Sequence, residues 1–396
     1  MNRKFLRKLY KAILILAAGL WLSLGQKGWA IIPTIPSTAL PGNGSVVAGS
    51  VTSYTGGTLT VSGNTAILWG NGTLNNLPQG GSVPGFNIGS SATLTITASS
   101  FSPVLNVDVT GNPSQILGTL TASANTPVFV ANGSGIIVGS SATINAVGGI
   151  GLLGYDLSST ASTFAGTVSV GSTTTGSFVN IQSGASISSG ASILVAAPQV
   201  NVGIAHPGSI SYVNNFFVLS GYSFTSFDGT ALLGQSPIAE SSGSITISGP
   251  SSGTFSFVIG DFVESSGSIT TSGNLILPGG KNTQWGTGNG INLASGVLTN
   301  NGTLEFTGSS LTGGVVTGSL VNNGTILANG ADLYISVGGS ITNNSGATIT
   351  GITSTGNFNV TLNAGVHGSP GNGIGGGLTT WEQSAGLIVL HSVLPM

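Results

Sequence analysis

A short motif that recurs near the C-terminal end constrains the fold more than any other feature of the sequence. "NNGTL" begins at Asn300, "NNGTI" at Asn322 and "NNSGATI" at Asn343, so the motif repeats after 22 and then 21 residues. A fixed period of roughly 20 to 50 residues indicates a solenoid, a propeller or an array. One coil of a parallel β-helix, with three short strands and three corners, needs about this many residues, whereas a propeller blade needs roughly twice as many. The period therefore favours a parallel β-helix.

Short segments with alternating apolar and polar residues extend this pattern along the chain. Examples are "TLTVSG" from Thr58, "ATLTIT" from Ala92, "GSITIS" from Gly243 and "GTLEFTG" from Gly302. Period-two alternation predicts strands with one face in the core and one face in solvent. Clusters of Gly, Asn and Ser separate these segments, and such residues favour tight turns. The sequence predicts an all-β protein in which helices are nearly absent.

The chain carries very few charges, and only 4% of its residues are Asp, Glu, Lys or Arg. Equivalent residues of successive coils stack roughly 4.8 Å apart in a β-helix, so a repeated charge would face its own copy. Stacked amides avoid that repulsion, and the paired Asn at each repeat start predicts an amide ladder at a corner. N-glycosylation is the alternative for Asn301, Asn323 and Asn343, because each begins an Asn-x-Ser/Thr sequon.

The first 30 residues have the pattern of a cleaved secretory signal peptide. Six of the seven Lys and Arg residues lie in positions 3–27, and the apolar run 12–24 precedes the small-residue site 28–30. That run is shorter than the roughly 20 residues of a spanning helix, although an uncleaved anchor is the alternative. Cleavage after Ala30 would leave one Lys and nine carboxylates, a formal charge of −8 that excludes a basic surface for nucleic acid. The chain has no Cys, which excludes disulfides and thiolate metal sites.

Four ordered blocks between Ala39 and about Leu157 resemble the N-terminal secretion domain of the filamentous haemagglutinin family, the exoproteins of two-partner secretion. They are "ALPGNGSVVAGS" from Ala39, "GFNIGSSATLTI" from Gly85, "VTGNPSQILGTL" from Val109 and "PVFVANGSGIIVGSSATINAVGGIGLL" from Pro127. The resemblance implies a right-handed parallel β-helix with an N-terminal cap. It also implies export through a partner pore in the outer membrane.

The secretion motif of that family, Asn-Pro-Asn-Gly-Ile, falls on Asn132, Gly133, Ser134, Gly135 and Ile136. This sequence departs from the motif, with Gly in place of Pro and Ser in place of the second Asn. The family's Asn-Arg block falls near Asn106 and Val107, where the Arg is missing, and Trp69 stands for the Trp that precedes the Phe-Asn-Ile-Gly block.

The domain organisation that follows from these patterns has four parts. We expect a signal peptide over residues 1–30 and a secretion domain, formed by a capped β-helix, over 31–210. We expect the β-helix to continue with an aromatic-rich insert or hairpin over 211–290, and repetitive coils with the C-terminal end over 291–396.

Candidate catalytic residues are scattered, so we expect no enzymatic activity, no cofactor and no metal site. Polysaccharide lyases and hydrolases also use the β-helix fold, and they require a basic residue, bound calcium or paired carboxylates. The closest acidic pair, Asp261 and Glu264, would point to opposite faces of a regular strand. His206 precedes a Pro and is predicted to mark a corner.

The densest aromatic stretch contains Phe216, Phe217, Tyr222 and Phe224. These side chains could stack inside the helix and under a hairpin that covers its wall, or form an exposed contact patch for a carbohydrate or a surface protein. The predicted function is a secreted or surface-associated exoprotein that serves adhesion or aggregation, with the outer-membrane pore as export partner and self-association as an option. The alternatives are a polysaccharide-active β-helix enzyme and a structural envelope or matrix protein.

Overall fold

The computed structural model divides the chain into two units, Met1–Thr34 and Ile35–Met396. The described residues are 32–72, 83–172, 174–205, 209–233, 238–239 and 243–249, followed by 257–258, 262–265, 268–272, 274–278, 291–293, 297–307, 312–316, 319–329, 333–337, 340–352, 357–363 and 378–384. Side chains are described up to residue 233 within these ranges and in 243–249, 297–304, 319–327 and 340–350. The predicted signal peptide lies outside the described residues.

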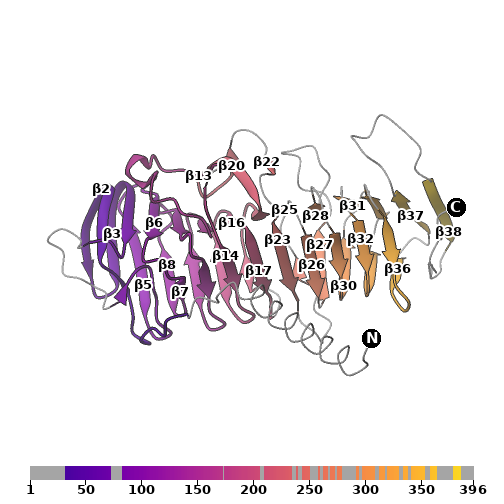
Figure 1. Cartoon of the computed structure of the whole chain (residues 1–396), viewed down its shortest axis with the longest axis horizontal. Helices are drawn as coiled ribbons and strands as arrows, with labels where there is room; N and C mark the ends of the chain where they lie inside the picture. The colour runs from indigo at the N-terminus through magenta and orange to yellow at the C-terminus, as the bar shows by residue number, and fades with distance from the viewer. Residues whose placement is uncertain are drawn as a thin grey trace, which may run out of the picture. The chain divides into compact units, whose positions relative to one another are not determined.

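Three walls of parallel strands form the second unit, and each coil contributes one strand to each wall (Figure 1). The first wall contains β6 (Val104–Asp108), β9 (Val128–Ala131), β12 (Ile150–Leu153), β16 (Ile193–Ala197), β19 (Phe216–Ser220), β25 (Phe262–Ser265), β28 (Ile291–Leu293), β31 (Thr312–Val316), β34 (Leu333–Val337) and β37 (Asn357–Asn363). The second wall contains β7 (Ser114–Ile116), β10 (Ile136–Val138), β14 (Phe178–Ile181), β17 (Gln199–Gly203), β23 (Ser244–Ser248), β26 (Ser268–Ser272), β29 (Val297–Asn300), β32 (Ser319–Asn322) and β35 (Ile341–Asn343).

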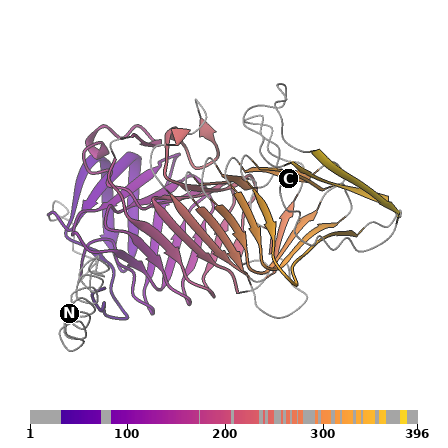
Figure 2. The same cartoon turned by 45° about the vertical axis from the view of Figure 1, so that its right-hand side comes forward.

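The third wall has two sections. The first section contains β5 (Thr93–Ala98), β8 (Thr119–Ala122), β11 (Thr143–Ala146), β15 (Ser186–Ser189) and β18 (Ile210–Ser211). The second contains β24 (Phe257–Val258), β27 (Asn274–Pro278), β30 (Thr303–Thr307), β33 (Thr325–Asn329) and β36 (Thr348–Ile352). Within each section, and along the first and second walls, each strand pairs in parallel with its equivalent in the next coil. Figure 2 shows these strands side by side. The protein is therefore a parallel β-helix with three strands per coil, as the repeat predicts.

An antiparallel hairpin caps the first coil. β2 (Gly44–Thr55) pairs with β3 (Thr58–Trp69), and the other edge of β3 pairs with both β5 and β6. The short strands β1 (Pro41–Gly42) and β4 (Val83–Pro84) pair beside it. The register of β2 shifts three times, and Gly49 takes a φ of 65° where a Cβ would approach the Asn64 carbonyl to 2.4 Å. Bulges of this kind discourage further strand pairing at an edge, so the hairpin ends the helix.

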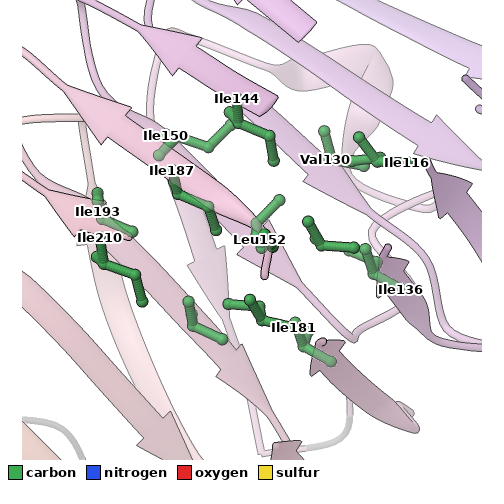
Figure 3. Close-up of a cluster of buried hydrophobic side chains, with 14 of the residues drawn as sticks. Ile116, Val130, Ile136, Ile144, Ile150, Leu152, Ile181, Ile187, Ile193 and Ile210 are labelled. Carbon is green, nitrogen blue, oxygen red and sulfur yellow. The ribbon is translucent and has the colours of Figure 1, made fainter. Parts of the chain in front are cut away.

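The core inside the helix is lined by aliphatic side chains from all three walls. Figure 3 shows Val130, Ile150 and Leu152 of the first wall facing side chains from the other two walls. Ile116, Ile136 and Ile181 come from the second wall, and Ile144, Ile187 and Ile210 from the third. These positions are at most 5% exposed. Alternate residues of each strand point inward, so the period-two pattern of the sequence produces this core.

A second apolar layer covers the outside of the first wall in the N-terminal half. Strands β9, β12, β16 and β19 are buried at every position because their outer side chains pack beneath two excursions of the chain. One excursion carries η1 (Ala161–Thr163) and β13 (Val168–Val170), and the other carries β20 (Tyr222–Phe227), β21 (Leu232–Leu233) and β22 (Ile238–Ala239). The excursions join through antiparallel pairing of β13 with β20. The first excursion lengthens its coil, and as a result the stacked residues Asn145 and Ser188 lie 43 residues apart in the sequence.

The repeated Asn pairs form two amide ladders, as the sequence predicts. In the inner ladder, Asn300 Nδ2 donates to Asn322 Oδ1 at 2.8 Å, and Asn322 Nδ2 donates to Asn343 Oδ1 at 2.7 Å. In the outer, exposed ladder, Asn323 Nδ2 donates to Asn301 Oδ1 at 2.7 Å, and Asn344 Nδ2 donates to Asn323 Oδ1. The outer ladder uses the side-chain nitrogen of Asn323 to which a glycan would be attached, and the corresponding nitrogen of Asn343 donates to Ala347 O at 2.9 Å.

Candidate functional site

The turn between β9 and β10 holds the first four residues of the predicted secretion motif, and the fifth, Ile136, begins β10. Asn132 Oδ1 accepts the backbone N–H of Ser134 at 2.7 Å, and its carbonyl accepts that of Gly135 at 3.0 Å, so Asn132 closes the turn by itself. Gly135 takes a φ of 114°, a region that L side chains rarely adopt. A Cβ at Gly135 would lie 2.6 Å from the Phe178 ring. Glycine is therefore required at the fourth motif position by both the backbone and the packing.

Only two of the five motif residues reach the surface. Asn132 is 1% exposed and Ile136 is fully buried in the inner core, whereas Gly133 and Ser134 are half-buried. The Asn132 amide points into the molecule, where it donates to Asn112 O at 2.8 Å and to Ser114 Oγ at 3.0 Å. The side chain of Asn132 therefore ties the turn to the preceding coil and is not available to a partner.

A buried carboxylate lies beneath this contact. Ser114 Oγ donates to Asp108 Oδ2 at 2.8 Å, and the same oxygen accepts the backbone N–H of Phe86 at 2.8 Å. Asp108 Oδ1 accepts the backbone N–H of Thr110 at 3.0 Å and its hydroxyl at 2.7 Å. Asp108 is 3% exposed, and these four hydrogen bonds replace the water that a buried carboxylate loses.

Two further contacts tie together the blocks that precede the motif. Trp69 Nε1 donates to Asn106 Oδ1 at 3.0 Å, and Asn106 Nδ2 donates to the carbonyl of Phe129 at 3.3 Å. The backbone N–H of Gln115 donates to Asn87 Oδ1 at 3.0 Å. We call the buried side chains of these contacts the polar network; they are Trp69, Asn87, Asn106, Asp108, Ser114 and Asn132.

Sequence reasoning named Trp69, Asn106 and Asn132 of this network but not Asn87, Asp108 or Ser114 as members of one site. Polar residues at otherwise apolar strand positions, as in "VLNVD" (104–108), indicate buried polar side chains of this kind. A buried polar group must find a partner, but a single sequence does not show which residue of another coil supplies it.

The replacement of Pro by Gly at the second motif position has a packing reason. A Cβ at Gly133 would lie 2.8 Å from Asp156 Cβ, closer than real side-chain contacts allow. Asp156 is exposed and its backbone N–H donates to Thr175 O at 2.9 Å, which holds it against the turn. Glycine at position 133 therefore makes room for Asp156.

The prediction of an exposed aromatic patch is wrong, because Phe216, Phe217, Tyr222 and Phe224 are 1%, 2%, 5% and 4% exposed. Phe216 points into the inner core beside Tyr212, and Phe217 points outward against Phe227 with ring centroids 6.2 Å apart. The alternative arrangement, an internal stack with a hairpin over the wall, is the one that forms.

Two titratable groups with clear pKa shifts, Tyr155 and Asp228, belong to the excursions that form the outer layer. Burial raises the pKa of the Tyr155 phenol, against a hydrogen bond with the backbone of Gly221 that lowers it, so the phenol stays neutral. Burial acts to raise the pKa of Asp228, but hydrogen bonds from the Thr230 hydroxyl and from the backbone of Ala231 and Thr230 outweigh it. The pKa of Asp228 is therefore lower than its ordinary value.

The other candidate sites gain no support from the described part of the chain. His206, Asp261 and Lys281 lie outside the described residues, as does the side chain of Glu264. Among residues with described placement, no group of three or more His, Asp or Glu side chains is arranged to hold a metal ion. Within the same residues, no helix is long and apolar enough to cross a membrane.

A comparison with solved structures finds a likeness to a secretion domain. The chain is similar to the crystal structure of the HMW1 secretion domain from Haemophilus influenzae, with a TM-score of 0.42 and 16% sequence identity over 81% of this chain and 76% of that chain. No family model matches the sequence, and no curated protein matches it. The assignment of the fold rests on the strand pairing described above.

Proposed function

We propose that this chain is an exported β-helical protein of the two-partner secretion type, whose first coils are read by a pore in the outer membrane. The observation that carries the proposal is the polar network. Its members form three sets of contacts across the first coils: Trp69 with Asn106, Ser114 with both Asp108 and Asn132, and Asn87 with the backbone of Gln115. Asn87, Ser114 and Asn132 lie in blocks that resemble the family, and Trp69 and Asn106 lie at positions matched to it. A resemblance by composition alone would not place these residues in contact.

The network suggests how a pore would recognise the turn. Asn132 and Asp108 are buried, so they hold the turn in one conformation, and they are positioning residues. The surface that remains for a partner consists of Gly133, Ser134 and the main chain around them. Rigid presentation of a small surface lowers the entropy cost of binding.

We further propose that the exported protein acts in adhesion or aggregation and performs no catalysis. The carboxylates with described side chains accept hydrogen bonds that fix the surrounding chain. Asp108 accepts four such bonds, and Asp156 Oδ1 accepts the backbone N–H of Ser158. Asp228 Oδ1 accepts three bonds from Thr230 and Ala231. The third wall presents uncharged columns to solvent, such as Thr95 beside Thr121 and Asn145 beside Ser188. A repetitive uncharged wall suits extended contact with another surface better than it suits acid–base chemistry.

Export is tested by expressing the full chain in its own host with and without a candidate two-partner secretion pore of that host, and by measuring the share of protein outside the cell. We expect deletion of the pore to abolish export. Ser134→Lys should reduce export strongly, because it places a long charged side chain at the half-buried turn without removing a hydrogen bond of the network. Ser140→Lys is the matched control on the exposed corner after β10 and should be exported normally. Export that is unchanged without the pore would refute the proposal.

The adhesive role needs a separate experiment on the purified exported protein. With the fold confirmed by circular dichroism, we expect it to bind cells or immobilised glycans, or to aggregate in solution. A folded protein that does none of these would contradict the role in adhesion, while the cleavage of a polysaccharide would support the enzyme alternative.

A further inference from the structure

The turn after β9 has a charged neighbour that neither the repeat nor the motif explains. Asp156 lies directly against Gly133, the one motif residue whose Cβ would clash with it. Of the three carboxylates with described side chains, Asp108 is buried and Asp228 is half-buried, whereas Asp156 is exposed. The one exposed carboxylate of this part of the chain therefore stands beside the residues that the proposed pore would read.

The Asp156 carboxylate is fixed in place. Its backbone N–H donates to Thr175 O at 2.9 Å, and the flanking residues Tyr155 and Leu157 are 5% and 3% exposed. Oδ1 accepts the backbone N–H of Ser158 at 2.9 Å, whereas Oδ2 accepts no hydrogen bond from the residues that the structure describes. One oxygen orients the group, and the other is presented to solvent.

No basic residue of this chain is available nearby in sequence to pair with Asp156. The sequence contains no Lys or Arg between Lys27 and Lys281. Lys27 belongs to the predicted signal peptide, and the Lys281 position is separated from Asp156 by several coils' length of sequence. Among the residues that the structure describes there is no Lys or Arg, so no described group of this chain can pair with the carboxylate.

We propose that Asp156, together with Gly133, Ser134 and the exposed residue Asn112, forms one docking surface for a basic side chain of the pore. Asn112 is exposed, and it is held beside the turn because its carbonyl accepts a hydrogen bond from Asn132 Nδ2 at 2.8 Å. The inference rests on the proposed function and names the chemistry of its partner, which is a protein segment with an Arg or Lys placed against an uncharged turn. An Arg suits the site because its guanidinium also donates to carbonyl oxygens around the carboxylate.

The charge is tested first by export. Asp156→Asn keeps an oxygen for the Ser158 N–H but removes the charge, and Asp156→Lys reverses the charge. Export through the pore should fall with Asp156→Asn and fall further with Asp156→Lys. Asp228→Asn, which neutralises a carboxylate on the covering hairpin, and Ser140→Lys, which adds a cation at another corner of the helix, should both be exported as the wild type is.

Binding of the full chain to the detergent-solubilised pore then separates a charge effect from a folding effect. We expect Asp156→Asn to weaken binding about two- to fivefold at low ionic strength, with the difference shrinking as salt is added. Asp156→Lys should weaken it at least about tenfold, since like charges would then meet. Pore-dependent export and binding that do not change in either Asp156 variant would overturn this inference alone. Export that never required the pore would overturn the proposed function instead.

Discussion

The coils from β6 to β19 and the coils from β29 to β36 stack their strands in the same parallel way, but different contacts stabilise them. In the first region, unlike residues form hydrogen bonds between elements: Trp69 of the capping strand β3 bonds to Asn106, and Ser114 bonds to Asp108. An apolar layer outside the first wall adds a second core there. In the second region, a residue contacts its own equivalent in the next coil, as Asn300 contacts Asn322.

This difference explains where a recognition site can lie. A ladder presents the same group at every coil, so no coil of it is distinguished from the next. Interlocked residues make each corner different, and the turn 132–136 with its neighbour Asp156 is such a corner. Repetition provides extended structure, whereas the irregular coils provide corners that differ from one another and that a partner can distinguish. Four predictions test this contrast, beginning with the largest effect.

The outer layer is the feature that most separates the two regions, and Phe129 is at its centre. Its ring is fully buried and lies 6.0 Å from Phe164 and 5.9 Å from Phe227, one ring from each excursion. Phe129→Ala should lower the free energy of unfolding by about 3–5 kcal/mol. Denaturant unfolding measures this loss, and limited proteolysis should show new cleavage in both excursions. Phe101→Ala, at a side chain that is 64% exposed, is the control and should change little. If both variants lowered the free energy of unfolding equally, the outer layer would not be a feature that stabilises the first region.

The two kinds of polar contact differ in how their losses combine. Asn132→Ala and Asn322→Ala should each cost about 1–3 kcal/mol, because each leaves buried groups without partners. Combined, these two variants should be additive, since they lie in different regions. Asn300→Ala with Asn322→Ala should cost less than the sum, because one shared hydrogen bond is lost only once. Thermal and denaturant unfolding of the single and double variants measure both cycles. Additivity within the ladder would show that its amides act independently.

The contrast also decides what the sequence alone could predict. The ladders and the three-strand coil followed from the 21- to 22-residue period, because stacking of equivalent residues turns a spatial contact into a sequence repeat. The position of the motif turn followed from its resemblance to a family. The hairpin over the first wall was one of the two arrangements expected for the aromatic stretch, whereas the excursion with η1 and β13 was not anticipated, although strands apolar at every position, such as "ILVAA" (193–197), indicate burial on both faces. The contact of Asp156 with Gly133 could not be predicted, since it depends on how an irregular excursion leaves the helix after β12.

The exposed ladder tests why the repeats contain so few charges. Asn301→Asp with Asn323→Asp would place two carboxylates in adjacent coils. In the wild type, Asn323 Nδ2 and Asn301 Oδ1 are 2.7 Å apart at these positions. Repulsion at the strand spacing of about 4.8 Å in water amounts to roughly 1 kcal/mol, so the double variant should lose about that much stability. The loss should shrink in high salt. Asn301→Asp alone is the control and should cost less. If the double variant were as stable as the single one at low salt, charge repulsion would not explain the composition of the ladder.

The smallest effect concerns Asp228, a carboxylate of the irregular region whose pKa is lowered by its own turn. A lowered pKa in the folded state adds stability that is present above the ordinary pKa of an Asp and is lost as the pH falls through the folded value. Asp228→Asn removes this contribution, so the wild type should exceed the variant in stability at neutral pH by more than it does at acid pH. The difference should be small because solvent screens a carboxylate that is only partly buried. Urea unfolding across a pH series measures it, with Asp156→Asn as the comparison variant at an exposed carboxylate. A gap between wild type and Asp228→Asn that stays constant from neutral to acid pH would mean that the hydrogen bonds from Thr230 and Ala231 stabilise the hairpin without regard to the charge they surround.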